Sequence, residues 1–190
     1  MPLAIELAAA RSGLFGPSEL LARLERSLSF LAGGRDVPDR QRTLCGAIDW
    51  SHELLSEPEQ VLFRRLSVFA GGCTLEAVEA VCAPGELDLD AVDGVTSLHD
   101  KSLLRRDDAA AGALRVTMLE TIREYARERL EACGEGPATR QRHAAFFETL
   151  ARRAATHIPG PDQERWLDVL DRELDNFRAA IRSAIDSEGS

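Results

Sequence analysis

The feature that most constrains the fold of this chain is a change of hydrophobic periodicity along residues 114–133. Apolar residues first alternate, as in a β-strand, and then recur at helical spacing: Leu114, Val116 and Met118, then Leu119, Ile122, Ala126, Leu130 and Cys133. Residues 102–106 form a second strand candidate, and the intervening sequence DDAAAG suits a hairpin that ends on Gly112. The fold must therefore hold a two-stranded hairpin that leads directly into a helix.

Helical periodicity dominates the rest of the chain. The sequence SEPE is a capping box, in which Ser56 and Glu59 satisfy each other's backbone amides at the start of a helix. Gly71 and Gly72 are expected to end that helix in a left-handed conformation, and Thr74 to cap the next one. The other expected helices span residues 3–11, 18–31, 39–55, 89–97, 138–157 and 163–185.

This order of elements predicts a mainly α fold, with a winged-helix domain (a helical core plus a two-stranded β wing) flanked by helical segments. The sequence AGGRDVPD is rich in helix breakers and marks a domain boundary. We expect a helical segment over residues 1–34, the winged-helix domain over 35–134 and a helical hairpin over 135–190. The apolar stripe of the last helix predicts packing against the helix before it, or a docking face for a partner.

The charge of the chain argues against direct DNA binding. The formal net charge is −9, which repels a phosphate backbone. The candidate recognition region, LDLDAVDGVTSLHD, contains no arginine and four aspartates, Asp88, Asp90, Asp93 and Asp100. Arg105 and Arg106 on the wing are too few to offset them. Direct DNA binding is therefore disfavoured, and a winged helix that packs against protein is favoured.

No residue pattern indicates an active site or a metal site. The cysteines have neither C-x-x-C spacing nor a nearby histidine at zinc-ligand spacing, so we interpret them as reduced, apolar residues of a cytoplasmic protein. His52 and Asp49 share a helix face, but a structural hydrogen bond is the simpler interpretation than acid–base chemistry. No apolar run is long enough to span a membrane. We expect neither catalytic residues nor metal ligands; an enzyme with an unrecognised site stays a rival hypothesis.

Several stretches together resemble the NB-ARC-type signal-transduction ATPases of the STAND class, in particular bacterial regulators of the LuxR or SARP type. PLAIELAAAR resembles the GLPLA motif, and RQRTLCGAIDWSHELLSEPEQVLFRRLSVFAGGCTLEAVEAV resembles the winged-helix segment. LHDKSLL and VTMLETIREYARERL match the wing and the following helix, whereas RHAAFFETLA and LDRELDNFRAAI resemble the start of a TPR-like helical-repeat sensor. The resemblance covers nearly the whole chain.

The resemblance implies a nucleotide-dependent switch of which this chain is the regulatory part. Pro2 and Leu3 match the GLPLA positions that lie near the nucleotide. The triplet Met118-Leu119-Glu120 matches the MHD motif, but Leu119 replaces the histidine and cannot donate a hydrogen bond to a phosphate. The chain has no Walker A loop, since Lys101 follows no glycine run, so the chain itself has no cofactor and ADP or ATP is assigned to a separate P-loop domain.

The resulting hypothesis is a relay. The chain would couple the nucleotide state of a P-loop domain, in the same or a related chain, to a helical-repeat sensor through protein–protein contacts. The alternative is a winged-helix DNA-binding transcriptional regulator. The segment at residues 115–130 would then be a joint in the first case and part of a DNA-reading element in the second.

Overall fold

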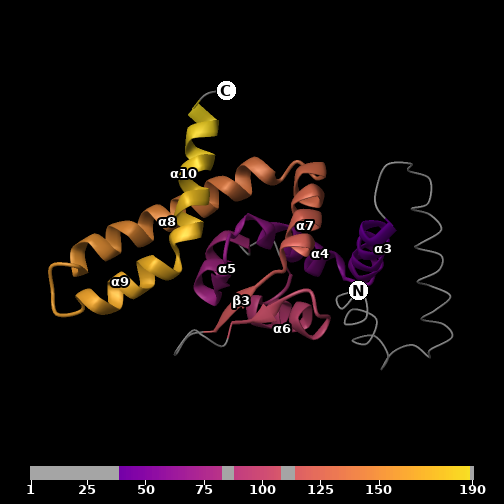
Figure 1. Cartoon of the computed structure of the whole chain (residues 1–190), viewed down its shortest axis with the longest axis horizontal. Coiled ribbons are helices and arrows are strands. Elements are labelled where there is room, and N and C mark those ends of the chain that lie inside the picture. The colour runs from indigo at the N-terminus through magenta and orange to yellow at the C-terminus, as the bar shows by residue number, and fades with distance from the viewer. Residues whose placement is uncertain (1–38, 83–87, 108–113, 189–190) are drawn as a thin grey trace.

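The computed structural model describes residues 39–82, 88–107 and 114–188 (Figure 1). The expected helices over residues 3–11 and 18–31 lie outside these ranges. The elements, in chain order, are α3 (Asp39–Glu53), α4 (Glu57–Arg65), the 3-10 helix η2 (Leu66–Val68), β1 (Cys73–Thr74), α5 (Leu75–Cys82), α6 (Ala91–Asp100), β2 (Arg105–Arg106), β3 (Arg115–Thr117), α7 (Glu120–Ala132), α8 (Gly136–His157), α9 (Gln163–Arg172) and α10 (Leu174–Glu188). The fold is mainly α with a winged-helix domain, as the sequence predicted.

The sheet has three strands, whereas the sequence predicted a two-stranded wing. The strand order is β1-β3-β2, with both pairs antiparallel, and Cys73 lies opposite Val116 while Arg105 lies opposite Thr117. The extra strand β1 is only two residues long, too short to show an alternating pattern. Thr74 belongs to β1, yet its hydroxyl still accepts a hydrogen bond from the Ala77 amide at 3.3 Å at the start of α5.

Gly72 allows the turn into β1 to lie directly against β3. Its φ is +93°, and a Cβ atom there would lie 2.6 Å from the Val116 carbonyl oxygen and 2.7 Å from Thr117 Cγ2. The preceding Gly71 also has a positive φ, so the predicted left-handed glycines are confirmed. The helix before them ends sooner than expected, because α4 gives way to η2 at Leu66.

The C-terminal region contains one more helix break than the sequence predicted. Residues 163–185 were expected to form one helix, but α9 ends at Arg172 and α10 begins at Leu174. Glu173 between them leaves the helical conformation, with φ −97° and ψ 6°, and its side chain is buried against Arg115. A contact distant in sequence thus interrupts a helix whose local pattern is continuous.

One hydrophobic cluster joins the winged helix to the C-terminal helices. It is mostly aliphatic, with Val78, Leu98 and Ile122 completely buried. Phe147 of α8 and Ala180 of α10 belong to the same cluster. Figure 1 shows α8 running from the end of α7 past α5, with α9 folded back along it and α10 crossing it. The division at residue 134/135 stays a prediction, although both parts share this core.

The helix α7 packs as the sequence predicted, except at its ends. Ile122, Ala126 and Leu130 are buried, but Leu119 is only partly buried and Cys133 is exposed. Cys133 lies beyond the last helical residue, so the helical period no longer determines its direction. Among the described helices, none is long and apolar enough to cross a membrane.

We expect Gly72→Ala to destabilise the fold by about 3 kcal/mol or more, since it adds a backbone clash to the cost of a positive φ. Gly134→Ala is the matched control: its φ is +71° and nothing lies within 4 Å of the added Cβ, so it should cost only about 1 kcal/mol. Urea denaturation followed by circular dichroism measures both. Equal losses in the two variants would contradict the close approach at Gly72.

Candidate functional site

The helix α6 occupies the recognition-helix position of the winged helix, after α5 and before the wing. Asp90 caps it by accepting hydrogen bonds from the amides of Val92 at 2.8 Å and Asp93 at 3.3 Å. One face packs on the core through Ala91, Gly94, Val95 and Leu98. The opposite face is exposed and presents Val92, Asp93, Thr96, His99 and Asp100. The surface that a winged helix can offer to a partner is therefore acidic here.

Glu59 anchors α6 to α4. Its carboxylate accepts hydrogen bonds from the Ser56 amide at 2.7 Å, from the Ser97 hydroxyl and from the Lys101 ammonium group. The predicted capping role of Glu59 is confirmed, and the same carboxylate also accepts hydrogen bonds from Ser97 in α6 and from Lys101 directly after it. Burial raises the pKa of Glu59, but the hydrogen bonds from Lys101 and Ser97 outweigh it and lower the pKa to about 2.

The wing carries two exposed arginines beside a buried one. Arg105 and Arg106 of β2 are exposed, whereas Arg115 of β3 is only 4% exposed. Leu114, the apolar neighbour of Arg115, is 40% exposed. The charged residue is thus buried and its apolar neighbour exposed, the reverse of the usual pattern. This indicates that Arg115 has polar partners inside the fold.

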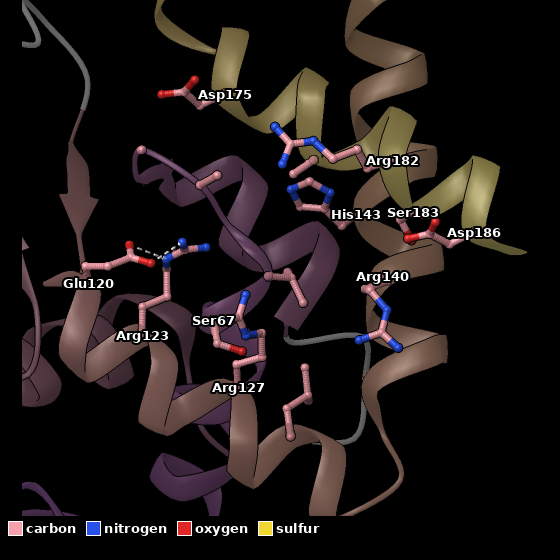
Figure 2. Close-up of a pocket in the computed structure, with 15 residues that line it drawn as sticks. Ser67, Glu120, Arg123, Arg127, Arg140, His143, Asp175, Arg182, Ser183 and Asp186 are labelled. Carbon is pink, nitrogen blue, oxygen red and sulfur yellow. Dashed lines mark hydrogen bonds and ion pairs between the residues drawn. The ribbon is translucent and has the colours of Figure 1, made fainter. Parts of the chain in front are cut away.

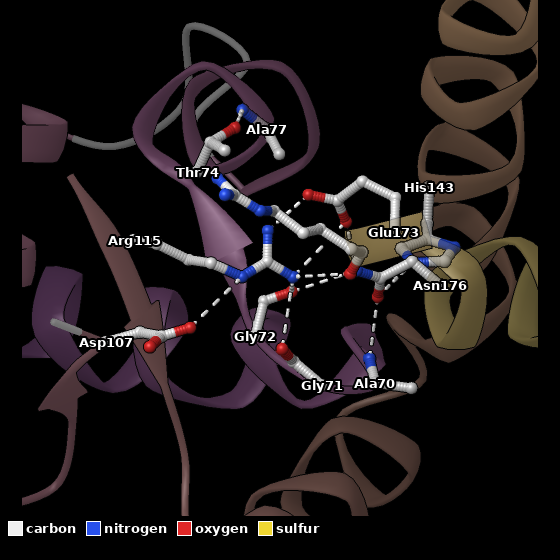
Figure 3. Close-up of polar contacts among 11 residues, drawn as sticks. Ala70, Gly71, Gly72, Thr74, Ala77, Asp107, Arg115, His143, Glu173 and Asn176 are labelled. Carbon is white, nitrogen blue, oxygen red and sulfur yellow. Dashed lines mark hydrogen bonds and ion pairs between the residues drawn. The ribbon is translucent and has the colours of Figure 1, made fainter. Parts of the chain in front are cut away.

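Arg115 is the centre of a buried polar junction behind the wing (Figure 3). Its guanidinium group forms an ion pair with Glu173 and donates hydrogen bonds to the carbonyl oxygens of Gly71 at 3.1 Å, Gly72 at 3.3 Å and Arg172 at 3.3 Å. Asp107 lies 3.8 Å from Arg115 Nε. One side chain therefore joins β3 to the glycine turn and to the α9–α10 break.

Asn176 completes this junction. It accepts a hydrogen bond from the Ala70 amide at 2.7 Å and donates to the Gly72 carbonyl at 2.9 Å and to Glu173 Oε2 at 2.7 Å. His143 Nε2 of α8 lies 3.5 Å from Asn176 Oδ1. Burial lowers the pKa of His143 to about 4, against a smaller opposing effect of the Asn176 hydrogen bond, so the ring is neutral near pH 7.

The sequence did not reveal this junction. Glu173 reads as one more charged residue of a surface helix, and Arg115 occupies a strand position that alternation assigns to the solvent side. A polar asparagine beside Phe177, in an otherwise regular apolar stripe, is the one local hint. Arg115, His143, Glu173 and Asn176 come together only because α8 and α10 fold back on the winged helix.

The nucleotide-proximal residues implied by the resemblance are not tested. Pro2 and Leu3 lie outside the described residues. Of the triplet at residues 118–120, Leu119 precedes the first turn of α7, and Glu120 forms an ion pair with Arg123 at 2.7 Å.

The residues considered for acid–base chemistry have structural partners. Asp49 accepts hydrogen bonds from Tyr125 and, at 2.8 Å, from Arg129. The ring of His52 packs edge-on against Tyr125, with the ring centroids 5.8 Å apart. The interpretation of His52 as a partly buried structural residue is confirmed.

The two buried cysteines, Cys73 and Cys82, offer no activated thiol, because burial raises the pKa of both. Cys73 and Cys82 are buried and unpaired, and Cys133 is exposed and unpaired. Burial raises the pKa of the Cys73 thiol to about 12. Within residues 39–82, 88–107 and 114–188, no group of three His, Cys, Asp or Glu side chains is placed to hold a metal ion.

Comparison with known proteins agrees with the winged-helix geometry. Residues 55–131 match the family described as "Winged helix-turn-helix domain". The match begins just before α4 and ends in α7, so it includes α6 and all three strands. No solved structure matches the chain.

The relatives are longer proteins. A "Putative HTH-type transcriptional regulator" of Mycobacterium tuberculosis (Rv0890c) is 45% identical over 184 residues, covering 95% of this chain and 20% of the relative, and its Mycobacterium bovis counterpart (Mb0914c) gives the same values. An "Uncharacterized protein" of M. tuberculosis (Rv0894) is 39% identical over 147 residues, 75% of this chain and 37% of the relative. The chain spans about a fifth of the length of the first two relatives.

We expect Glu59 to make stability depend on pH in acid. Its pKa is about 4.5 in the unfolded chain and about 2 in the folded one, so its stabilising effect is complete above pH 4.5 and disappears as the pH falls towards 2. The loss should be of the order of 2–3 kcal/mol. Urea unfolding between pH 2 and 7 should show a shallower acid decline for Glu59→Gln. The exposed Glu57→Gln is the charge-matched control; an unchanged slope in Glu59→Gln would refute the assignment.

We expect Arg115→Met to destabilise the chain by about 3–5 kcal/mol, because it leaves the Glu173 carboxylate buried without its partner. Arg152→Met breaks an exposed pair with Glu148 on α8 and should cost less than about 0.5 kcal/mol. The double variant Arg115→Met/Glu173→Met should recover much of the loss, since no buried charge remains. Chemical denaturation tests this; similar effects for Arg115→Met and Arg152→Met would contradict the junction.

Proposed function

We propose that this chain is a winged-helix component of a larger transcriptional regulator, and that its winged helix contacts protein rather than DNA. It acts in the cytoplasm and catalyses no reaction itself. The first part of the proposal is supported by the winged helix-turn-helix match and by the relatives' names. The second part is supported by one observation, the acidic exposed face of α6.

The negative charge of α6 favours contact with protein over contact with DNA. A recognition helix in a major groove lies between two phosphate backbones, and its side chains gain most of their affinity from positive charge. The exposed face of α6 carries Asp93 and Asp100, Asp90 caps its start, and there is no lysine or arginine between residues 88 and 100. Lys101, the cation directly after α6, is held by Glu59. This face repels DNA and suits a basic protein surface.

Direct DNA binding is the second candidate. It is favoured by the family match over residues 55–131 and by the "HTH-type" relatives, and it would use the exposed arginines Arg105 and Arg106 of the wing. The relatives' name describes proteins of which this chain covers 20%, so the name alone does not assign DNA binding to this segment. A binding measurement on the chain itself decides between the two candidates.

The narrower proposal is the nucleotide relay. Its support is the resemblance to NB-ARC-type ATPases, in which a P-loop domain of the same or a related chain would bind ADP or ATP and the C-terminal helices would begin a TPR-like sensor. A relay requires different affinities of the chain for that domain in its ADP and ATP states. Calorimetry with the P-loop domain in each state measures both affinities, and equal values would refute the relay.

We expect the purified chain to bind a labelled mixed-sequence DNA duplex no tighter than about 10 µM at about 50 mM salt, a condition that strengthens phosphate contacts. Fluorescence anisotropy measures this. Submicromolar binding that weakens steeply with salt and is lost in Arg105→Gln/Arg106→Gln would replace protein contact by DNA binding. Arg152→Gln/Arg165→Gln, which removes two exposed arginines from α8 and α9, is the charge-matched control.

A further inference from the structure

A second polar feature is a cavity of about 500 Å³ that borders the junction at Gly71 and His143. It is bordered by α7, α8, α10 and the segment from η2 to Gly71, so the winged helix and the C-terminal helices both contribute to its wall. The volume is typical of sites that hold small molecules. Neither the acidic face of α6 nor the wing takes part in it.

Four arginines line this cavity in a chain whose net charge is −9. Arg123 and Arg127 come from α7, Arg140 from α8 and Arg182 from α10. Figure 2 shows Arg127 and Arg182 extending from opposite sides of the view, with the His143 ring below Arg182. Guanidinium groups from three helices therefore converge on one volume.

Two of these arginines have partners inside the chain. Arg123 donates to both carboxylate oxygens of Glu120, at 3.0 and 2.7 Å. Arg140 forms an ion pair with Glu131 of α7. The charges of these two arginines are neutralised by the paired glutamates. Arg123 and Arg140 therefore line the cavity but are not expected to bind a ligand.

Arg127 and Arg182 are different. Neither has a hydrogen bond or an ion pair with any residue in the described part of the chain. The remaining carboxylates at the cavity do not compensate them, because Asp175 is paired with Arg178 at 3.1 Å and Asp186 also has an interaction partner. Arg127 interacts with the Glu120 carboxylate only at longer range, through its charge, and the guanidinium groups of both arginines keep their hydrogen-bond donors available to a ligand in the cavity.

We propose that this cavity binds a small phosphorylated ligand, held between Arg127 of α7 and Arg182 of α10. A phosphate monoester carries close to two negative charges at neutral pH, which suits two guanidinium groups whose hydrogen-bond donors are available. Guanidinium forks donate paired hydrogen bonds to phosphate oxygens with good geometry. The neutral His143 ring offers the ligand a polar but uncharged surface.

The position of the site gives binding a structural consequence. Arg127 belongs to α7, the helix that follows the wing. Arg182 belongs to α10, which also carries Asn176, the hydrogen-bond partner of Glu173. A phosphate bound by both side chains would tie α7 to α10. Binding should therefore stabilise the folded chain in proportion to ligand concentration. Ligand binding in this cavity does not depend on whether α6 contacts protein or DNA. Either proposal can therefore be refuted without affecting the other.

The test uses the whole 190-residue chain, with inorganic pyrophosphate and ribose 5-phosphate as probes and sodium chloride at matched ionic strength as the background. We expect saturable binding in calorimetry with a Kd below about 1 mM and a concentration-dependent rise in Tm. Arg127→Gln/Arg182→Gln should weaken binding by roughly tenfold or more, because both charged donors are lost. Both side chains are exposed, so this variant should fold, which far-UV circular dichroism checks.

The control variant is Arg152→Gln/Arg165→Gln, which makes the same change of net charge at exposed positions that do not line the cavity. It should bind the probes as the unmodified chain does. Three outcomes would overturn the proposal. They are no saturable binding of either probe up to about 10 mM, equal weakening of binding in the two double variants, and binding that added salt weakens but Arg127→Gln/Arg182→Gln does not. A Tm rise that survives Arg127→Gln/Arg182→Gln would also place the anion elsewhere.

Discussion

The buried ion pair between Arg115 and Glu173 is the contact on which the arrangement of the winged helix and the C-terminal helices depends. Moving two charges out of water is costly, and their attraction repays the cost only when the remaining hydrogen-bonding groups are also satisfied. Here the carbonyl oxygens of Gly71, Gly72 and Arg172 accept from the same guanidinium group, and Asn176 donates to Glu173. Neither charge can leave without stranding the other, so the junction is specific.

This specificity explains several local features that look unrelated. The break between α9 and α10 at Glu173 turns that side chain towards Arg115, and the positive φ of Gly72 brings its carbonyl close to the same guanidinium group. Around this polar centre, Phe147 and Ala180 extend the winged-helix core into the hairpin. A movement of α10 would disturb β3 directly, and through β3 the other two strands of the wing.

The sequence was sufficient for the features that repeat and insufficient for those that depend on a single contact. Helices such as α3, α7 and α8, the left-handed glycines and the role of Glu59 in the capping box all follow from local patterns. The strand β1 was missed because two residues have no period. Alternation placed Leu114 inside and Arg115 outside, and the reverse is true. Arg115 is buried because it binds Glu173, which lies 58 residues away along the chain and is therefore invisible to a local pattern. Burial of a charge depends on a partner that periodicity cannot locate.

The junction and the arginine cavity are built partly from the same elements. α10 carries Asn176 of the junction and Arg182 of the cavity, and α7 carries Arg127 directly after the strand that contains Arg115. The junction holds the start of α10 near β3, whereas Arg127 and Arg182 line the cavity further along α7 and α10. An anion bound by both arginines would add a second connection between α7 and α10. The distribution of charge therefore supports a coupling between ligand occupancy and the position of the wing, whichever partner α6 contacts.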